Sequence, residues 1–475
     1  MLKFNRTKIV ATVGPASNNK ETLTALVKEG VDVFRLNFSH GTHEGHAEVI
    51  KMIHEINETL NSNVGILADL QGPKIRLGDV ENGEVFIKTG DTITFTTNEM
   101  VCTSEELYLT YEDFARDVKV GDRVLMDDGK LQLTVLNTNG EDKVTAKILF
   151  GGSVKPRKGV NLPDTSISIP SITPKDIRDL EFILTQPVNW IALSFVRTPE
   201  EIIQLRGIVK FGKHPAKIIS KIEKPEAIKN IDRIIEVSDA VMVARGDLGV
   251  EIPLEQVPIA QKMIVRKCNE VAKPVIIATQ ILESMIYSPT PTRAEATDAA
   301  NAIFDGADAI MLSGETAAGS YPIEAIKTFT KIIEEVEKQD VIYHKEHLPR
   351  KKSAHYYSDV VCYNTCTIAE QVDADGVICL THTGYTALLL SSFRPKANIY
   401  AFTDDKILIN TLSLVWGVQA FFAPPFKNTD DGIMGVQRKL KESGYVKRGD
   451  VVVNTGSMPM NLRGKTNMVK LGRIE

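Results

Sequence analysis

Short apolar, β-branched runs recur along the chain, and most of the segments between them have helical periodicity. Eight such runs lie at residues 8–13, 31–36, 64–70, 190–196, 217–222, 240–244, 274–279 and 309–312. They are almost continuously apolar, which is typical of strands that are buried on both faces of a parallel sheet. Buried strands that alternate with helices in this way predict a closed (β/α)₈ TIM barrel rather than an open sheet.

The segments between these runs carry helix start and stop signals. A capping-box pattern, which pairs an N-cap residue with an acidic residue three positions later, occurs at Asn18 and Glu21, at Thr198 and Glu201, and at Thr292 and Glu295. Glycine follows two of these segments, as expected for a helix C-terminus, at Gly30 and Gly306. These signals place helices between successive strands, as a barrel requires.

One stretch, residues 73–170, interrupts the alternation. It is rich in Val, Thr and Ile, contains no convincing helix, and is divided by turn signals at Asn82-Gly83, Gly90-Asp91, Gly121-Asp122, Asp128-Gly129 and Asn139-Gly140. Residues 131–136 and 143–149 predict a hairpin around the last of these turns. We therefore expect a small β-barrel domain inserted after the third strand, on the catalytic face of the TIM barrel, where it could act as a lid.

A second α/β region follows the barrel, after a charged linker at residues 331–352. Its expected strands lie at residues 377–380, 399–403, 418–422 and 451–454. The sequence thus predicts three domains: a catalytic barrel at 1–72 and 171–345, an inserted lid at 73–170, and a C-terminal α/β regulatory domain at 346–475.

Composition narrows the class of protein. The chain has 56 Lys and Arg against 61 Asp and Glu, a formal net charge of −5, which argues against a nucleic-acid-binding protein. Hydrophobic residues make up 43% and charged residues 25%, as in an ordinary globular protein. No apolar run is long enough to span a membrane, and Lys3, Arg6 and Lys8 interrupt the N-terminus before a signal sequence could form. We expect a cytoplasmic protein.

Candidate chemistry follows from the residues at the C-terminal ends of the expected strands, where barrel active sites lie. Glu223 and Asp247 suit a hard divalent cation such as Mg²⁺, or Mn²⁺. Arg35, Arg76 and Lys221 add positive charge that would bind a substrate with phosphate and carboxylate groups. Charges at strand ends are often only solvated, but a lysine inside the apolar run 217–222 would be costly without a partner. The set indicates phosphoryl transfer or chemistry on an enolate.

A family resemblance rests on motifs that occur in a characteristic order. They span residues 7–17, 35–41, 69–76, 161–163, 219–223, 243–249, 278–280 and 311–316. With these motifs the chain resembles the pyruvate kinases from near its first residue to near its last. The resemblance implies transfer of the phosphoryl group of phosphoenolpyruvate to ADP, which gives pyruvate and ATP in the last step of glycolysis. It also implies a homotetramer.

The resemblance also implies the roles of individual residues. Catalysis would involve Lys221, which stabilises the phosphoryl group in transfer, Arg35, which binds the same phosphate, and Thr279, near which the enolate gains its proton. Mg²⁺ would be held by Glu223 and Asp247. The substrate carboxylate would meet the backbone amides of Arg245, Gly246 and Asp247. The positions that match the nucleotide site are Thr12, Pro15, His40, Arg76 and Lys175.

The chain departs from the common family pattern at Lys74, where a glutamate is usual. In that pattern a potassium ion is bound by Asn37, Ser39, Asp69 and the carbonyl of Leu70. A lysine at position 74 is similar to the family branch in which the ammonium group replaces the monovalent cation. We therefore predict activity without added K⁺.

The C-terminal region fits a phosphate-binding regulatory loop less sharply. Hydroxyl groups and a glycine near a helix start suit an anion, and they lie at Thr381, Thr383, Gly384 and Thr386. His382 and Tyr385 stand where the family members that respond to fructose bisphosphate have basic residues. An allosteric site for a phosphorylated effector and a purely structural turn both remain open.

Two other functional classes remain open at this point. Mg²⁺-dependent barrel lyases also stabilise pyruvate enolates, but they would need neither the insertion nor the residues that match a nucleotide site, so ADP dependence separates them from a kinase. A metabolite sensor built on the same fold would most simply have lost Lys221, Glu223 or Asp247, and all three are present.

Overall fold

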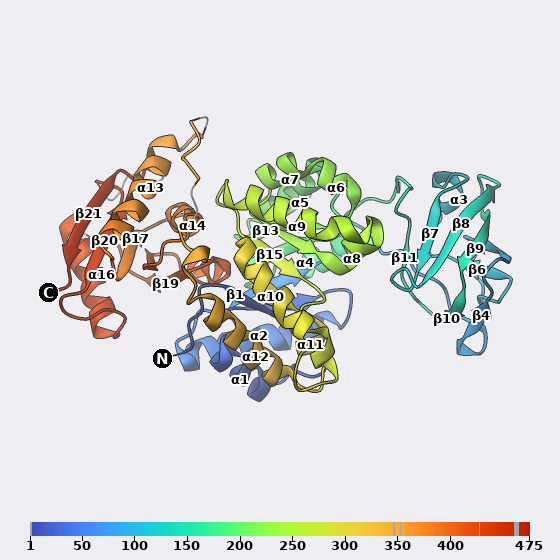
Figure 1. Cartoon of the computed structure of the whole chain (residues 1–475), viewed down its shortest axis with the longest axis horizontal. Helices are drawn as coiled ribbons and strands as arrows, with labels where there is room; N and C mark the ends of the chain where they lie inside the picture. The colour runs from blue at the N-terminus through green and yellow to red at the C-terminus, as the bar shows by residue number, and fades with distance from the viewer. Residues whose placement is uncertain (1, 345–346, 352, 427, 460–464) are drawn as a thin grey trace.

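The computed structural model describes residues 2–344, 347–351, 353–426, 428–459 and 465–475. A central barrel lies between two smaller units along the long axis of the molecule (Figure 1). The β-rich insertion, coloured teal, lies at one end of this axis, and the C-terminal α/β unit, coloured orange and red, lies at the other. Within the described residues, no helix is both long and apolar enough to cross a membrane.

The barrel is closed and parallel. Its strands are β1 (Lys8–Thr12), β2 (Val33–Asn37), β3 (Gly65–Asp69), β12 (Trp190–Leu193), β13 (Lys217–Ile222), β14 (Ala240–Ala244), β15 (Val275–Ala278) and β16 (Ala309–Leu312). The hydrogen-bonded order is β1-β16-β15-β14-β13-β12-β3-β2, and β1 pairs with both β2 and β16, which closes the ring. The predicted TIM barrel is confirmed.

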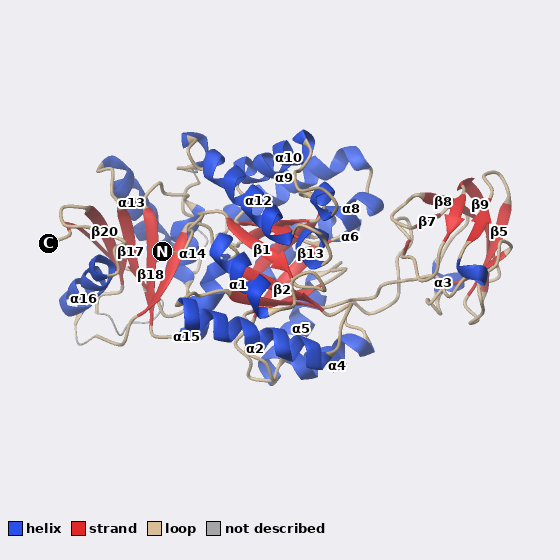
Figure 2. Cartoon of the chain, turned by 90° about the horizontal axis from the view of Figure 1, so that it is seen from below, coloured by secondary structure: helices blue, strands red, loops and turns tan. Residues whose placement is uncertain are grey.

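Helices surround these strands, as Figure 2 shows. They are α1 (Lys20–Glu29), α2 (His43–Leu60), α4 (Pro174–Ile183), α5 (Pro199–Phe211), α6 (Pro225–Lys229), α7 (Ile231–Val237), α8 (Arg245–Glu251), α9 (Val257–Asn269), α10 (Arg293–Asp305), α11 (Gly314–Ala317) and α12 (Pro322–Val336). The short α8 begins directly after β14, so the end of that strand and the start of the helix form one turn at the barrel mouth.

Helix starts were predicted well where the capping box had its usual residues. The boxes of α5 and α10 are confirmed. For α1 the prediction was wrong by one residue: the helix begins at Lys20, so Asn19 rather than Asn18 lies beneath the free amide of Thr22 and accepts its hydrogen bond. The start of α4 has a capping box that was not predicted, because aspartate rather than glutamate or glutamine stands at its third position.

The insertion forms a β unit with a hydrophobic core of its own. Its strands are β4 (Val85–Ile87), β5 (Thr92–Thr96), β6 (Glu106–Tyr108), β7 (Arg123–Met126), β8 (Leu131–Thr138), β9 (Lys143–Phe150), β10 (Gly152–Val154) and β11 (Val160–Asn161), with the short helix α3 (Phe114–Asp117). They pair as a six-stranded sheet, β11-β7-β8-β9-β5-β6, and a two-stranded ribbon, β10-β4, which refines the expected β barrel. The predicted hairpin is the antiparallel pair of β8 and β9.

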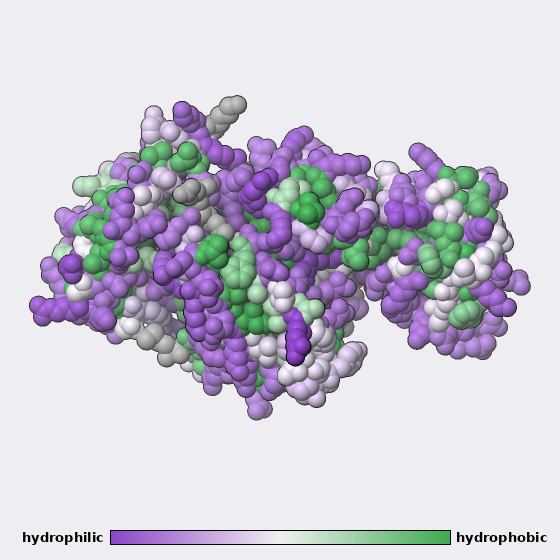
Figure 3. All heavy atoms as spheres, viewed as in Figure 1, coloured by the Kyte–Doolittle hydropathy of each residue, from purple (hydrophilic) through white to green (hydrophobic). Residues whose placement is uncertain are grey.

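The insertion's surface is not entirely polar. Figure 3 shows apolar atoms on it, and Phe86 and Phe150 are 64% and 60% exposed. Single exposed apolar side chains are common on folded proteins. Figure 2 shows that only extended chain segments join the insertion to the barrel, which suits a unit that moves as a body.

The C-terminal unit is a five-stranded sheet with helices. Its elements are α13 (Tyr356–Gln371), β17 (Gly376–Leu380), α14 (Tyr385–Ser392), β18 (Asn398–Thr403), α15 (Lys406–Thr411), β19 (Val418–Phe422), α16 (Thr429–Glu442), β20 (Val451–Gly456) and β21 (Met468–Arg473). The sheet order is β19-β18-β17-β20-β21, and the antiparallel edge strand β21 was not predicted. The predicted boundary at 345/346 lies outside the described residues.

A buried arginine joins this unit to the barrel. Arg394 is 1% exposed, and its guanidinium donates to Asp308 Oδ1 at 2.9 Å and to the carbonyl of Gly306 at 2.7 Å. It also lies over the ring of Trp416, 4.7 Å from the ring centroid. Because Arg394 and Asp308 are both buried, loss of either side chain would leave the other as a buried charge without a partner.

Arg394→Met is expected to destabilise this junction by about 3–5 kcal/mol, because Asp308 is left as a buried charge without its partner. Urea unfolding followed by tryptophan fluorescence measures the effect, since Trp416 lies at the junction. Lys396→Met is the control: the ion pair of Lys396 with Asp340 is exposed on both sides, at 63% and 83%, and its loss should leave unfolding unchanged. Equal shifts in both variants would show that the junction does not depend on Arg394.

Candidate active site

The barrel mouth contains a buried network of charges built from adjacent strands. Arg35 of β2 donates from Nε to Asp69 Oδ2 at 2.7 Å, at the end of β3. The ammonium of Lys221, near the end of β13, lies 3.3 Å from the other oxygen of Asp69. Asp69 is 1% exposed, and it therefore holds two cationic side chains at one point of the mouth.

Lys221 is held by three partners. Besides Asp69, its Nζ lies 3.0 Å from Glu223 Oε1 and donates to Ser194 Oγ at 2.7 Å. Glu223 Oε2 in turn accepts a hydrogen bond from the amide of Phe195 at 2.6 Å. Phe195 has a φ of +54°, an uncommon conformation for a bulky residue, and such strain is frequent at functional sites.

Burial and neighbouring charges set the protonation of this network. Burial raises the pKa of Glu223, and the nearby Asp247 raises it further against the opposing effect of Lys221. Burial would also raise the pKa of Asp69, but Lys221 and Arg35 outweigh it and hold that pKa below its ordinary value. For Lys221, burial favours the neutral amine, yet Asp69 and Glu223 prevail and raise its pKa. The ammonium charge is therefore retained.

Glu223 and Asp247 are the residues that could hold a metal ion. Asp247 lies in the first turn of α8, and the two carboxylates are close enough to repel each other, as the pKa of Glu223 indicates. In the part of the chain that the structure describes, no three His, Cys, Asp or Glu residues are grouped to hold a metal. Mg²⁺ often takes only one or two carboxylates from the protein and its other ligands from substrate and water, so this pair fits it.

The start of α8 meets the end of β15 at Thr279. The amide of Gly246 donates to Thr279 Oγ1 at 2.7 Å, and that hydroxyl donates to the carbonyl of Ala278 at 2.6 Å. Thr279 and Gln280 have φ values of +68° and +55°, which is unusual for two successive residues that are not glycine. The structure thus brings Thr279 together with the backbone predicted to bind the substrate carboxylate.

The Arg245 side chain is used differently from its backbone. One of its amino groups donates to Asp298 Oδ1 at 2.8 Å, and the other donates to the carbonyls of Thr279 and Gln280 at 3.0 and 2.9 Å. The guanidinium therefore stabilises the turn after β15, because its hydrogen bonds hold the strained backbone of Thr279 and Gln280 in place.

Three residues of the predicted nucleotide set have clear positions. Thr12 is buried, donates to the carbonyl of Leu312 at 2.9 Å and accepts from Arg35. Arg76 donates to the carbonyl of Arg157, which lies in the insertion, at 3.0 Å. The pKa of His40 is lowered by partial burial and by the positive charges of Arg76 and others nearby, so these cationic groups lie in one region.

Lys175 and Pro15 complete the predicted nucleotide set. The Lys175 ammonium donates to the carbonyl of Phe38 at 2.5 Å and to Asp179 Oδ2 at 2.6 Å, so its charge is paired at the start of α4. Pro15 is exposed in the turn after β1. The structure thus puts Lys175 beside the second strand's loop and leaves Pro15 at the surface.

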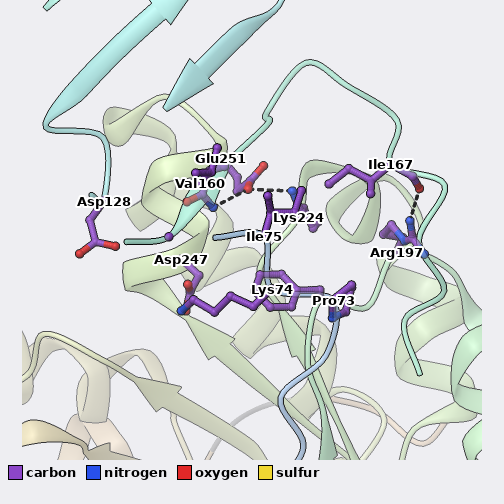
Figure 4. Close-up of a pocket in the computed structure, with 13 residues that line it drawn as sticks. Pro73, Lys74, Ile75, Asp128, Val160, Ile167, Arg197, Lys224, Asp247 and Glu251 are labelled. Atoms are coloured by element: carbon purple, nitrogen blue, oxygen red, sulfur yellow. Dashed lines mark hydrogen bonds and ion pairs between the residues drawn. The ribbon is translucent and has the colours of Figure 1, made fainter. Parts of the chain in front are cut away.

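Three of the four groups expected around a monovalent cation, Asn37, Asp69 and the carbonyl of Leu70, already have hydrogen-bond or ion-pair partners. Asn37 Oδ1 accepts from the amide of Ser39 at 3.1 Å, and the carbonyl of Leu70 accepts from Ser194 Oγ at 2.7 Å. Asp69 is bound by Arg35 and Lys221, as described above. Lys74 is exposed, has no ion pair with any of these described residues, and extends toward Asp247 in Figure 4. Its ammonium thus faces the gap between barrel and insertion.

A cavity of about 30 Å³ lies between the insertion and the barrel (Figure 4). Lys74 and Asp247 line it, together with Asn161, which the sequence noted only as part of a family motif, and with polar residues that the sequence did not single out: Asp128, Arg197, Lys224 and Glu251. Lys224 directly follows Glu223, and Asp128 was considered only as part of a turn. The sequence therefore offered a signal for Asp128, Lys224 and Asn161, whereas the roles of Arg197 and Glu251 depend on how the insertion meets the barrel.

The predicted regulatory loop uses most of its hydroxyls internally. Thr381 Oγ1 accepts from the amide of Gly384 at 3.0 Å, and Gly384 has a φ of +83°. Thr386 is buried and hydrogen-bonded to Thr466 at 2.8 Å. Thr383 is exposed at the tip of the loop, before α14.

The comparison with known families matches both parts of the chain. A family described as "Pyruvate kinase, barrel domain" matches residues 4–326, and one described as "Pyruvate kinase, alpha/beta domain" matches residues 359–471.

Individual relatives match over nearly the whole length. The chain is 44% identical to a pyruvate kinase of Clostridium acetobutylicum, over 99% of this chain and 100% of that protein. It is 42% identical to one of Corynebacterium glutamicum, over 98% and 96%. The crystal structure of a pyruvate kinase from Cryptosporidium parvum matches with a TM-score of 0.91 and 36% identity, over 99% of this chain and 96% of that one.

Proposed function

Because the chain belongs to the pyruvate kinase family, and is thus a phosphotransferase that makes pyruvate and ATP from phosphoenolpyruvate and ADP, we propose that the network at the barrel mouth performs this transfer. The observation that carries the proposal is the Lys221 ammonium, which is buried between Asp69 and Glu223 beside Arg35. Membership of this family sets the lyase and sensor alternatives aside.

Lys221 and Arg35 would act on the phosphoryl group. Phosphoryl transfer needs mainly positioning and positive charge around the transferred oxygens. The raised pKa of Lys221 keeps its ammonium charged throughout the physiological range. Arg35 offers a planar donor group that is held in place by Asp69 and by Thr12, which limits the reorganisation needed when substrate binds.

Glu223 and Asp247 would hold Mg²⁺, or Mn²⁺ in its place. When bound, the cation neutralises negative charge on the substrate oxygens. The amides at the start of α8 would bind the substrate carboxylate, and Thr279 would orient the donor of the proton that the enolate gains. Support for this comes from the hydrogen bond between the Gly246 amide and Thr279 Oγ1, which puts the proposed carboxylate-binding backbone next to the threonine proposed to orient the proton donor.

The insertion would act as a lid that keeps water from the phosphoryl group. Arg76, which lies near the start of the insertion and donates to the carbonyl of Arg157, would bind the nucleotide at this gap together with Thr12, Pro15 and His40, and Lys175 would contribute once it is released from Asp179. Closure of the gap would exclude water, so that ADP rather than water accepts the phosphoryl group.

K⁺ is not required in this proposal. The Lys74 ammonium faces the same gap and would supply the positive charge that a monovalent cation gives other family members. Asn37, Ser39, Asp69 and the carbonyl of Leu70 would then serve as structural hydrogen-bonding groups.

The remaining features of the proposal concern assembly and control. A homotetramer is supported by the exposed edge strand β21, with Leu471 50% exposed, since unprotected edges favour pairing with another chain. Thr381, Thr383, Gly384 and Thr386 would bind a phosphate of an effector, and Thr383 is the hydroxyl that is open to it. The proposed location is the cytoplasm, as expected from the sequence.

Removal of the divalent cation is expected to abolish pyruvate formation, and omission of ADP is expected to do the same. The test is pyruvate release from phosphoenolpyruvate with Mg²⁺ and ADP, with ADP omitted, and with excess chelator followed by Mg²⁺ or Mn²⁺. Activity should return with either cation, because two carboxylates bind both. Pyruvate formation that persists in chelator, or that needs no ADP, would contradict the proposed mechanism.

A further inference from the structure

Two barrel side chains, Glu251 and Arg197, hold the segment by which the insertion rejoins the barrel. Asn161, in β11, donates from Nδ2 to Glu251 Oε1 at 2.7 Å, at the end of α8. Arg197, after β12, donates to the carbonyls of Ile167 and Ile169. Figure 4 shows both barrel side chains at the rim of the cavity between the two units. The barrel is therefore linked to the insertion by specific polar contacts.

The contact at Glu251 is unusual in its burial. Lys224 Nζ donates to the same oxygen, Oε1, at 2.7 Å, and the two side chains are 7% and 0% exposed. Glu251 Oε2 is also buried and has no hydrogen-bond partner within the described residues. A buried ion pair with an unused acceptor is a poor source of stability, and apolar side chains would serve that purpose at least as well.

The position of the three residues suggests what the contact does. Lys224 directly follows Glu223, and Glu251 closes the helix that carries Asp247 in its first turn. Both elements that bear the candidate metal ligands therefore meet at one carboxylate, and the insertion reaches the same oxygen through Asn161. A displacement of the insertion must stretch or break this contact.

We propose that Glu251, Lys224 and Asn161 form a hinge clasp that fixes the insertion over the barrel mouth and keeps it aligned with the two carboxylate-bearing elements. They are positioning residues, which act through Glu223 and Asp247. The inference rests on the proposed function, in which the insertion is a lid. A loosened clasp admits water, which attacks phosphorus in place of ADP; the P–O bond to the enolate breaks, the enolate gains a proton, and pyruvate and inorganic phosphate result.

Asn161→Asp is the direct test, because it puts a second carboxylate against that of Glu251. The ratio of phosphate released to ATP formed is expected to rise about tenfold, and kcat/KM for ADP to fall about tenfold, since a small misplacement of the lid affects the reacting groups strongly. Asn137→Asp is the matched control: it adds the same charge to the insertion at an exposed position in β8. If Asn161→Asp does not fold, Asn161→Leu removes the hydrogen bond without adding charge.

A distance measurement separates failure of the clasp from failure of the lid. The five native cysteines are all buried, so Lys147→Cys in the insertion and Lys210→Cys in α5, both exposed, allow selective labelling with a fluorophore pair. Energy transfer should change when Mg²⁺, phosphoenolpyruvate and ADP are added, and less so with Asn161→Asp. No change in the parent protein would overturn the lid. An unaltered change in Asn161→Asp, with an unaltered phosphate-to-ATP ratio, would overturn the clasp.

Discussion

Replacing Lys221 with methionine is expected to lower turnover roughly a thousandfold while leaving the affinities for Mg²⁺ and phosphoenolpyruvate nearly intact. Methionine keeps the apolar stem but removes an ammonium that lies 3.0 Å from Glu223 and 3.3 Å from Asp69. That charge is needed most when the phosphoryl group is in transfer. Its loss therefore raises the energy of the transition state more than that of the bound substrate.

Steady-state kinetics and equilibrium binding of Mg²⁺ and phosphoenolpyruvate distinguish these two effects. Lys217→Met is the matched control, since Lys217 begins the same strand, β13, at the opposite end from the mouth. It should retain normal turnover. The Lys221→Met protein should also gain about as much thermal stability from Mg²⁺ as the parent protein does, because that gain follows the affinity for the cation. Near-normal turnover of Lys221→Met would refute its role in transfer.

The barrel could be predicted because its strands are buried on both faces. In β14, for example, all residues from Ala240 to Ala244 are buried, and the sequence shows an uninterrupted apolar run. The edge strand β21 has no such signature, since it contains Lys470 and Gly472 and is largely exposed. The ends of helices were harder to predict than their central turns. Asn18 and Asn19 are chemically alike, and only the position of the first free amide decides which of them caps α1.

The site residues could be named because a parallel barrel gathers the ends of its strands. Arg35 and Asp69 are far in sequence from Lys221 and Glu223, yet the structure connects all four at one point of the mouth. What each side chain binds could not be predicted in the same way. For Arg245 the sequence indicated only a role of the backbone amide at the substrate carboxylate, and nothing in it indicated that the guanidinium pairs with Asp298 in α10.

The contacts between the insertion and the barrel could not be predicted from the sequence, for a further reason. Asn161 and Glu251 are separated by 90 positions and belong to different units, so no spacing or periodicity connects them. Their contact depends on where the insertion lies against the barrel. A sequence pattern reports the environment of a residue within its own element, whereas an interface between units depends on two surfaces at once.

Lys74→Glu is expected to make the enzyme depend on K⁺. The parent protein should have the same turnover in potassium and in tetramethylammonium buffers, because the Lys74 ammonium supplies a positive charge at the gap near Asp247. Glutamate removes that charge and adds a negative one. Turnover of the variant without K⁺ should therefore fall about a hundredfold, the order expected for loss of one preorganised charge. Added K⁺, bound by the oxygens of Asn37, Ser39 and Asp69, should restore it.

Turnover measured against K⁺ concentration in both proteins tests this expectation. Lys155→Glu is the control, since it makes the same charge change at an exposed lysine of the insertion and should leave the enzyme independent of K⁺. A parent protein that is inactive until K⁺ is added would contradict the assignment. If both the parent and Lys74→Glu work equally well without K⁺, the positive charge that replaces the cation must come instead from Lys221 and Arg35, which already neutralise Asp69.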